Sequence, residues 1–193
     1  TDSLDLVTYP GGTAADPPKL SALVASPQFP FAAVYRVYGW IWDPAQCGGN
    51  PDGCRGPLLT YNPTQLRWWD VTLVGLKTTP GEPVYLPARN AQIDPGGQKA
   101  LVLYAEEKRI TLGYTIDDTV ANGYTVHIEN VCVDPNLLAL YRAQINPDGT
   151  RKTGKLPALS NGQALGTALT DEMQFAIRDR GTFMDPRSSK DWW

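Results

Sequence analysis

The sequence predicts a mainly β domain with one short helix and an extended N-terminal arm. Short runs rich in Val, Ile, Tyr and Trp are separated by turn residues, and one segment has the apolar spacing of a helix. The 193 residues include 18 glycines and 17 prolines, which implies many turns. Because 42% of the residues are hydrophobic, the chain is large enough to bury a core of its own.

Residues 1–30 form the predicted arm, since they are rich in Pro, Gly, Ala and Ser and show no sustained periodicity. Residues 31–193 form a single predicted β domain. Alternation over residues 32–42 predicts a first strand that is largely apolar on both faces. Later strands, each flanked by Gly, Pro, Asn or Asp, are expected at residues 65–74, 83–87, 100–105, 109–115, 124–133 and 172–178.

One helix is expected after the strand at residues 124–133. Asp134 can cap it and Pro135 suits its first position. Three apolar residues follow at helical spacing: Leu137, Leu138 and Tyr141. We expect this helix to end near residue 144.

The cysteines indicate an oxidising compartment. Cys47 and Cys54 bracket a loop rich in glycine, so a local disulfide is favoured over two reduced thiols. Together with a start at Thr1 without Met, this favours a processed, secreted protein of the extracellular space or cell envelope. Cys132 lies in the apolar run 131–133, and we expect it to be a free, buried structural thiol.

Composition excludes several classes of function. A net charge of −3 lacks the basic footprint of a nucleic-acid binder, and no apolar run approaches the roughly 20 residues of a membrane-spanning helix. His127 is the single histidine, whereas hydrolytic zinc sites draw on two or three imidazoles. No metal or cofactor is therefore predicted. His127 shares a strand face with Thr125 and Glu129, which favours a hydrogen-bonded strand histidine.

Six tryptophans occur as three pairs, and indole faces suit either sugar rings, a protein partner or the core. These candidate binding residues are Trp40, Trp42, Trp68, Trp69, Trp192 and Trp193. The terminal pair follows a charged stretch, so it either docks onto this domain's own sheet or contacts a neighbouring molecule. With the arm, it is a candidate for self-association into an oligomer or surface assembly.

Several segments match one enzyme family in order over residues 67–193. They are residues 81–88 (GEPVYLPA), 122–128 (NGYTVHI), 161–166 (NGQALG) and 172–178 (EMQFAIR), followed by Gly181 and Asp185-Pro186. This region resembles the lysostaphin-type zinc endopeptidases, which cut peptidoglycan cross-bridges. The resemblance implies an antiparallel β-sandwich of the duplicated-hybrid-motif type.

The metal ligands of that family are missing at the matching positions. The resemblance places a degenerate cleft at Val71, Gly75, His127, Glu172 and Gln174. It implies a secreted, catalytically inactive relative that serves as a structural or binding module for glycan, for peptidoglycan or for self-assembly. The alternative is a cell-wall hydrolase with altered metal or carboxylate chemistry, centred on His127, Glu172, Asp70 or Glu129.

Overall fold

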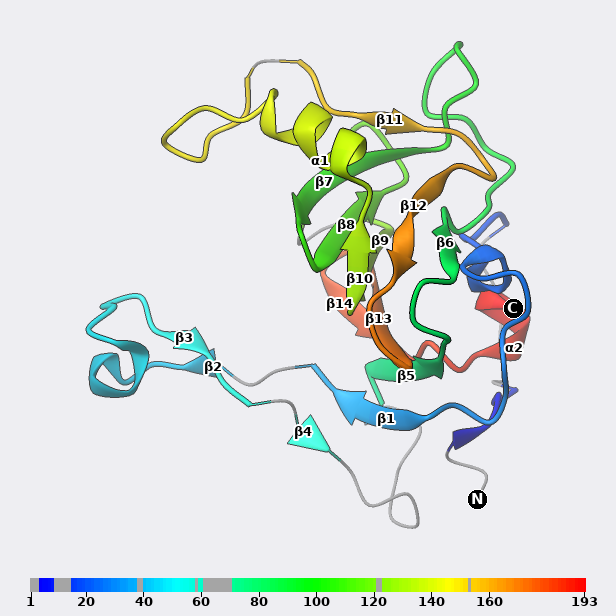
Figure 1. Cartoon of the computed structure of the whole chain (residues 1–193), viewed down its shortest axis with the longest axis horizontal. Coiled ribbons are helices and arrows are strands. Elements are labelled where there is room, and N and C mark those ends of the chain that lie inside the picture. Colours follow the sequence, from blue (N-terminus) through cyan, green and yellow to red (C-terminus); the bar gives the residue numbers. More distant parts are fainter. Residues whose placement is uncertain are drawn as a thin grey trace.

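The computed structural model describes residues 4–8, 15–37, 40–57, 59–60, 71–120, 123–152 and 154–193. Two antiparallel sheets in a sandwich-like arrangement make up most of it, with a hairpin projecting to one side (Figure 1). The predicted mainly β, antiparallel fold is confirmed. No helix in the described ranges is long and apolar enough to cross a membrane.

The larger sheet contains nine strands of the described chain. In spatial order they are β11 (Ala158–Leu159), β7 (Ala100–Glu106), β8 (Arg109–Gly113), β9 (Thr125–Glu129), β13 (Glu172–Asp179), β5 (Leu73–Lys77), β1 (Ala33–Arg36) and β4 (Leu59–Thr60), while β14 (Thr182–Met184) pairs with β13 beside β5. The smaller sheet consists of β10 (Val131–Val133), β12 (Ala164–Ala168) and β6 (Pro83–Tyr85). The projecting hairpin pairs β2 (Trp40–Ile41) with β3 (Cys54–Arg55).

Alternation along the strands decides which side chains form the core. In β13, Met173, Phe175 and Ile177 are fully buried, while Glu172 and Gln174 point to the other face and are half-buried. Inward-facing residues of β5, β7, β8 and β9 join the same cluster. The large sheet thus has one apolar face toward the core and one polar outer face.

The predicted helix is confirmed as α1 (Pro135–Arg142), which ends slightly earlier than expected. The Asp134 side chain accepts from the backbone N–H groups of Asn136 and Leu137, which satisfies two donors of the first turn. A second short helix, α2 (Ser189–Trp192), was not predicted. Two 3-10 helices complete the described elements, η2 (Leu20–Ala22) and η3 (Pro44–Cys47).

Two predictions around residues 124–133 are corrected. The expected single strand is divided into β9 and β10 by Asn130, whose φ of 61° turns the chain from the large sheet into the small one. Cys132 is exposed, not buried. Val131 and Val133 point into the core, so alternation turns the residue between them outward.

Two expected strands also have different bounds. β5 begins at Leu73 and extends to Lys77, and residues 65–70 of that prediction lie outside the described ranges. The run at residues 32–42 contains two separate short strands, β1 and β2. The predicted disulfide is confirmed, with the Cα atoms of Cys47 and Cys54 5.3 Å apart.

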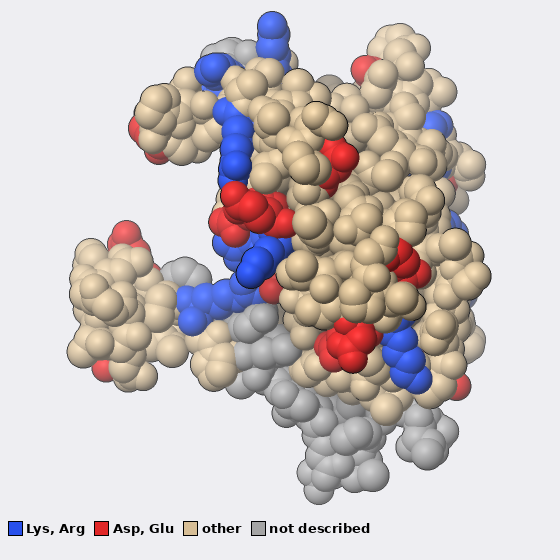
Figure 2. All heavy atoms as spheres, in the orientation of Figure 1, with Lys and Arg blue, Asp and Glu red and all other residues tan. Residues whose placement is uncertain are grey.

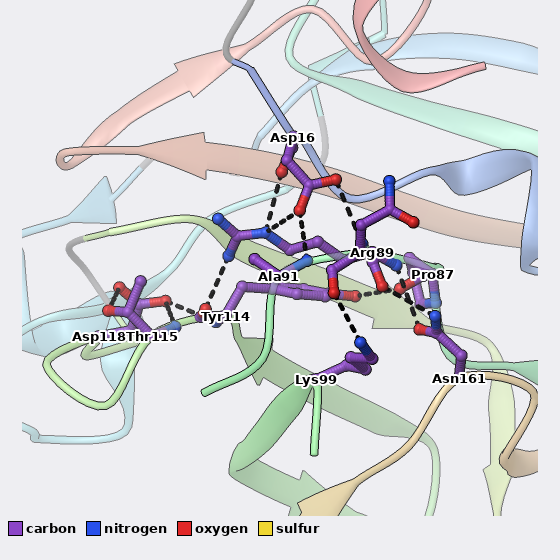
Figure 3. A network of polar contacts seen from close by, with 10 residues as sticks. Asp16, Pro87, Arg89, Ala91, Lys99, Tyr114, Thr115, Asp118 and Asn161 are labelled. Atoms are coloured by element: carbon purple, nitrogen blue, oxygen red, sulfur yellow. Dashed lines mark hydrogen bonds and ion pairs between the residues drawn. The ribbon is translucent and has the colours of Figure 1, made fainter. Parts of the chain in front are cut away.

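The described part of the arm packs on this domain itself. Leu20, Leu23 and Val24 are buried in the core. Asp16 accepts from the N–H groups of Asn90 and Ala91 at 3.2 and 2.6 Å (Figure 3). Burial raises the pKa of Asp16, but these hydrogen bonds outweigh it and hold that pKa below its ordinary value.

Arg89 links the arm to the strands of the domain. It donates to the carbonyl of Asp16 at 2.9 Å and to that of Tyr114 at 2.7 Å. The Tyr114 hydroxyl, which is buried, donates in turn to the carbonyl of Pro87 (Figure 3). The arm is therefore held by hydrogen bonds as well as by apolar burial.

The terminal tryptophans dock onto their own domain, which is the first of the two predicted alternatives. Trp192 is 2% exposed and its indole N–H donates to the carbonyl of Asp185. The Trp193 ring lies 4.9 Å from Phe29 and 5.7 Å from Phe31. These contacts place both indoles in apolar packing, so the pair does not form an open surface for a partner.

Candidate functional site

The polar outer face of the large sheet contains most of the predicted cleft residues. Strand register places Gln174 directly opposite Gly75 on one side and opposite Glu129 on the other. His127 lies opposite Thr111 of β8 and Ala176 of β13. Since paired residues share a face, four of the five cleft positions lie on this face. Val71 does not, because it is fully buried in the core.

Glu172 lies over Gly75. A Cβ atom added to Gly75 would stand 2.3 Å from Oε1 of Glu172, so only glycine leaves room for this carboxylate. The same oxygen accepts from the Tyr35 hydroxyl at 2.8 Å and from Nε2 of Gln174 at 3.0 Å. Tyr35, 137 residues before Glu172 in the sequence, and the nearby Gln174 thus hold the carboxylate in place.

His127 is also held by its neighbours. Its Nδ1 lies 3.0 Å from the Thr111 hydroxyl, and its Nε2 lies 3.4 Å from that of Thr125. The interpretation as a hydrogen-bonded strand histidine is confirmed. Burial, assisted by the nearby charge of Arg178, lowers the pKa of His127 to about 4. The imidazole is therefore neutral at pH 7.

The described residues offer little for a metal ion. Within these ranges, no three side chains of His, Cys, Asp or Glu converge on a point that could hold one. Asp70, which the hydrolase alternative includes, lies outside them. Glu129 is instead paired with Arg55 of the projecting hairpin at 2.6 Å.

A second charged cluster lies at the β7–β8 end of this face. Arg109 donates from two nitrogens to Glu106, at 2.8 and 2.9 Å, and its guanidinium stacks on the Tyr104 ring at 5.3 Å. The hydrogen bonds to Glu106 raise the pKa of Arg109. Burial and the hydroxyl's bond to Glu106 raise the pKa of Tyr104. Arg109 thus keeps its charge across the physiological range.

A groove of about 700 Å³ lies between these groups. We call it the sheet groove; its lining includes Tyr104, Arg109, Thr111, Val120, His127 and Glu129. Figure 2 shows the molecule hollowed between the hairpin and the loop that follows α1, with acidic and basic side chains meeting in the hollow. One groove therefore offers an aromatic ring, a cation, an anion and hydrogen-bonding side chains to a ligand.

The predicted aromatic residues are scattered. Trp42 is 73% exposed on the hairpin, Trp40 lies in β2, and Trp68 and Trp69 fall outside the described residues. Trp192 and Trp193 pack into the core cluster. The aromatic side chain at the sheet groove is Tyr104, which sequence reasoning missed.

The sequence contained one signal for the missed groove residues. Arg109 and Thr111 alternate with apolar residues along one predicted strand, as the already identified His127 and Glu129 do along another, which assigns each pair to one face of a sheet. That alternation does not show that the two strands are neighbours.

Comparison with known proteins adds no assignment. No protein-family model matches the chain, and no curated protein matches it.

Proposed function

We propose that the chain is a non-catalytic module of the cell envelope that binds peptidoglycan through the sheet groove. One observation supports binding over catalysis more than any other. The three candidate catalytic groups on this face are all engaged within the protein: the Glu172 carboxylate with Tyr35 and Gln174, the His127 ring beside two threonines, and the Glu129 carboxylate with Arg55. A general base must instead reach a proton of the substrate or of water.

The charges of the groove favour a ligand that carries both signs. Arg109 presents a guanidinium that is paired with Glu106, Glu129 presents a carboxylate that is paired with Arg55, and the Tyr104 ring lies against Arg109, so a ligand with both signs would bind by sharing these ion pairs. Peptidoglycan combines amino-sugar rings with short peptides that have amino and carboxylate groups. The resemblance to cell-wall endopeptidases agrees with this ligand, and the confirmed disulfide fits an extracellular setting.

Co-sedimentation with purified, insoluble peptidoglycan tests the proposal. We expect the wild-type protein to sediment with it. Arg109→Ala should weaken binding at least about tenfold, because a hydrogen bond to a charged group contributes about 1.5 to 3 kcal/mol. Lys77→Ala is the matched control, since Lys77 is exposed at the end of β5, outside the groove. Its binding should be unchanged.

The same incubation tests the hydrolase alternative. Release of soluble fragments by wild-type protein, abolished in Glu172→Gln, would establish hydrolysis and contradict a non-catalytic role. Failure of wild-type protein to sediment, or equal loss in Arg109→Ala and Lys77→Ala, would contradict binding at this groove. Thermal unfolding of each variant controls for loss of the fold.

A further inference from the structure

A second hollow of about 700 Å³ lies where the large sheet ends at β11. We call it the β11 groove. Its apolar lining includes Ile93, Leu101, Ile116, Leu140, Leu156 and Pro157. No residue lines both this hollow and the sheet groove, so the two are separate sites.

Apolar side chains are unusually exposed in the β11 groove. Ile116 is 70% exposed and Leu140 is 51% exposed. Helix α1 buries Leu137, Leu138 and Tyr141 against the core, which leaves Leu140 on its outer side. Single exposed apolar residues need no explanation, but two that line one hollow together with half-buried apolar neighbours are typical of an interaction site.

The rim of the groove is basic although the chain as a whole is acidic. Arg151, Lys152 and Lys155 line the hollow, against Asp94 as the acidic residue. The Asp94 carboxylate accepts hydrogen bonds from the backbone N–H groups of residues 96 and 98, so it is held within the turn that these residues form. Figure 2 shows Lys and Arg side chains over the segment between α1 and β11. A ligand with negative charge is favoured at this rim.

The backbone of β11 adds a third feature. Among the described strands β11 pairs with β7 alone and ends the sheet. The carbonyls of Pro157 and Leu159 accept N–H groups from the β7 side, at 2.9 and 2.7 Å. The N–H and C=O of Ala158, between them, therefore point to the opposite edge, and Ala158 also lines the hollow.

We propose that the β11 groove binds an extended peptide segment of a partner protein, with apolar anchor residues flanked by acidic ones. The peptide adds to the edge of β11, places its apolar side chains on Leu140 and Ile116, and pairs its carboxylates with Lys155 and with the guanidinium of Arg151, one nitrogen of which already donates to the Leu103 carbonyl. Edge addition supplies backbone hydrogen bonds, while pockets for alternate side chains supply specificity. This proposal does not depend on peptidoglycan binding at the sheet groove.

A library of random octapeptides displayed on phage, selected against the whole chain, tests this inference. We expect enriched peptides to combine apolar and acidic residues. In fluorescence anisotropy, a labelled enriched peptide should bind Lys155→Glu and Leu140→Asp at least about tenfold more weakly than wild type. Leu169→Asp, which changes an exposed leucine outside the groove, is the matched control and should bind normally. N-methylation of the backbone amide that pairs with β11 should also weaken binding.

Four outcomes would overturn the inference. Enriched peptides that bind Leu140→Asp as tightly as wild type would place the site elsewhere. A selection that enriches nothing would show that the chain binds no such peptide. If heparin, at the same concentration of negative charge, displaces the labelled peptide as well as the unlabelled peptide does, the site binds polyanions in general. Self-association of wild type that is abolished in Leu140→Asp, as measured by sedimentation velocity, would make a second copy of this chain the occupant.

Discussion

Replacing His127 with Gln removes the one imidazole of the chain and leaves an amide that can still hydrogen bond to Thr111. The folded protein holds the pKa of His127 at about 4, against an ordinary value of 6.5, because the ring is buried and lies near Arg178. As the pH falls below 6.5, the imidazole of His127 binds a proton in the unfolded chain but stays neutral in the folded chain. Stability from this group is therefore present above pH 6.5 and is lost as the pH falls toward 4.

The expected size follows from the two pKa values. Between pH 7.5 and pH 4.5 the unfolded histidine becomes almost fully protonated, while most of the folded population stays neutral. With one unit of pKa equal to about 1.4 kcal/mol, this difference amounts to about 2 to 3 kcal/mol of unfolding free energy.

Urea unfolding followed by tryptophan fluorescence at both pH values measures this contribution. Wild type should lose about 2 to 3 kcal/mol more than His127→Gln on acidification. Carboxylates titrate in both proteins, so their contribution cancels in the difference. If the two proteins lose the same stability between pH 7.5 and 4.5, the argument that burial holds His127 neutral is wrong.

Three other perturbations have expected outcomes. Gly123→Ala should lower the unfolding free energy by at least about 1 kcal/mol in a denaturant titration, since Gly123 has a φ of 92° and a Cβ there would stand 1.8 Å from Oδ1 of Asp118; an unchanged midpoint would contradict this. Trp192→Ala should cost about 3 to 5 kcal/mol, measured the same way, because the indole is buried; a loss below 1 kcal/mol would indicate that it is not packed. Alkylation without reductant should label one thiol, Cys132, quickly, and labelling at the disulfide-bonded pair would contradict the assigned bridge.

The elements that could be predicted from the sequence are those with a local signal. The helix was predicted because Asp134 caps it and its apolar residues recur at helical spacing. The strands β7, β8 and β13 were predicted because each contains five or more residues with apolar residues on one face. Strands of two or three residues, such as β3, β11 and β14, are too short to show a period.

The site depends on contacts that no local signal contains. Tyr35 reaches Glu172 across 137 residues because β1 and β13 both pair with β5. The pairing of Glu129 with Arg55 depends on where the hairpin projects. Cys132 was misassigned because an apolar run was interpreted as a buried strand, whereas the strand has only one face toward the core.

The position of β13 has a consequence for the order of folding. It lies between β9 and β5, so it joins a meander of β7, β8 and β9 to the pair β1 and β5. The strands β7, β8 and β9 can pair from nearby residues, whereas β5 begins about 35 residues after β1 ends, and the two halves of the sheet meet only through a strand about 45 residues beyond β9 and 95 beyond β5. Closing such long loops is slow, since their entropy is lost before the contacts form. We therefore expect insertion of β13 to set the folding rate, and truncating Phe175 to slow refolding more than it speeds unfolding.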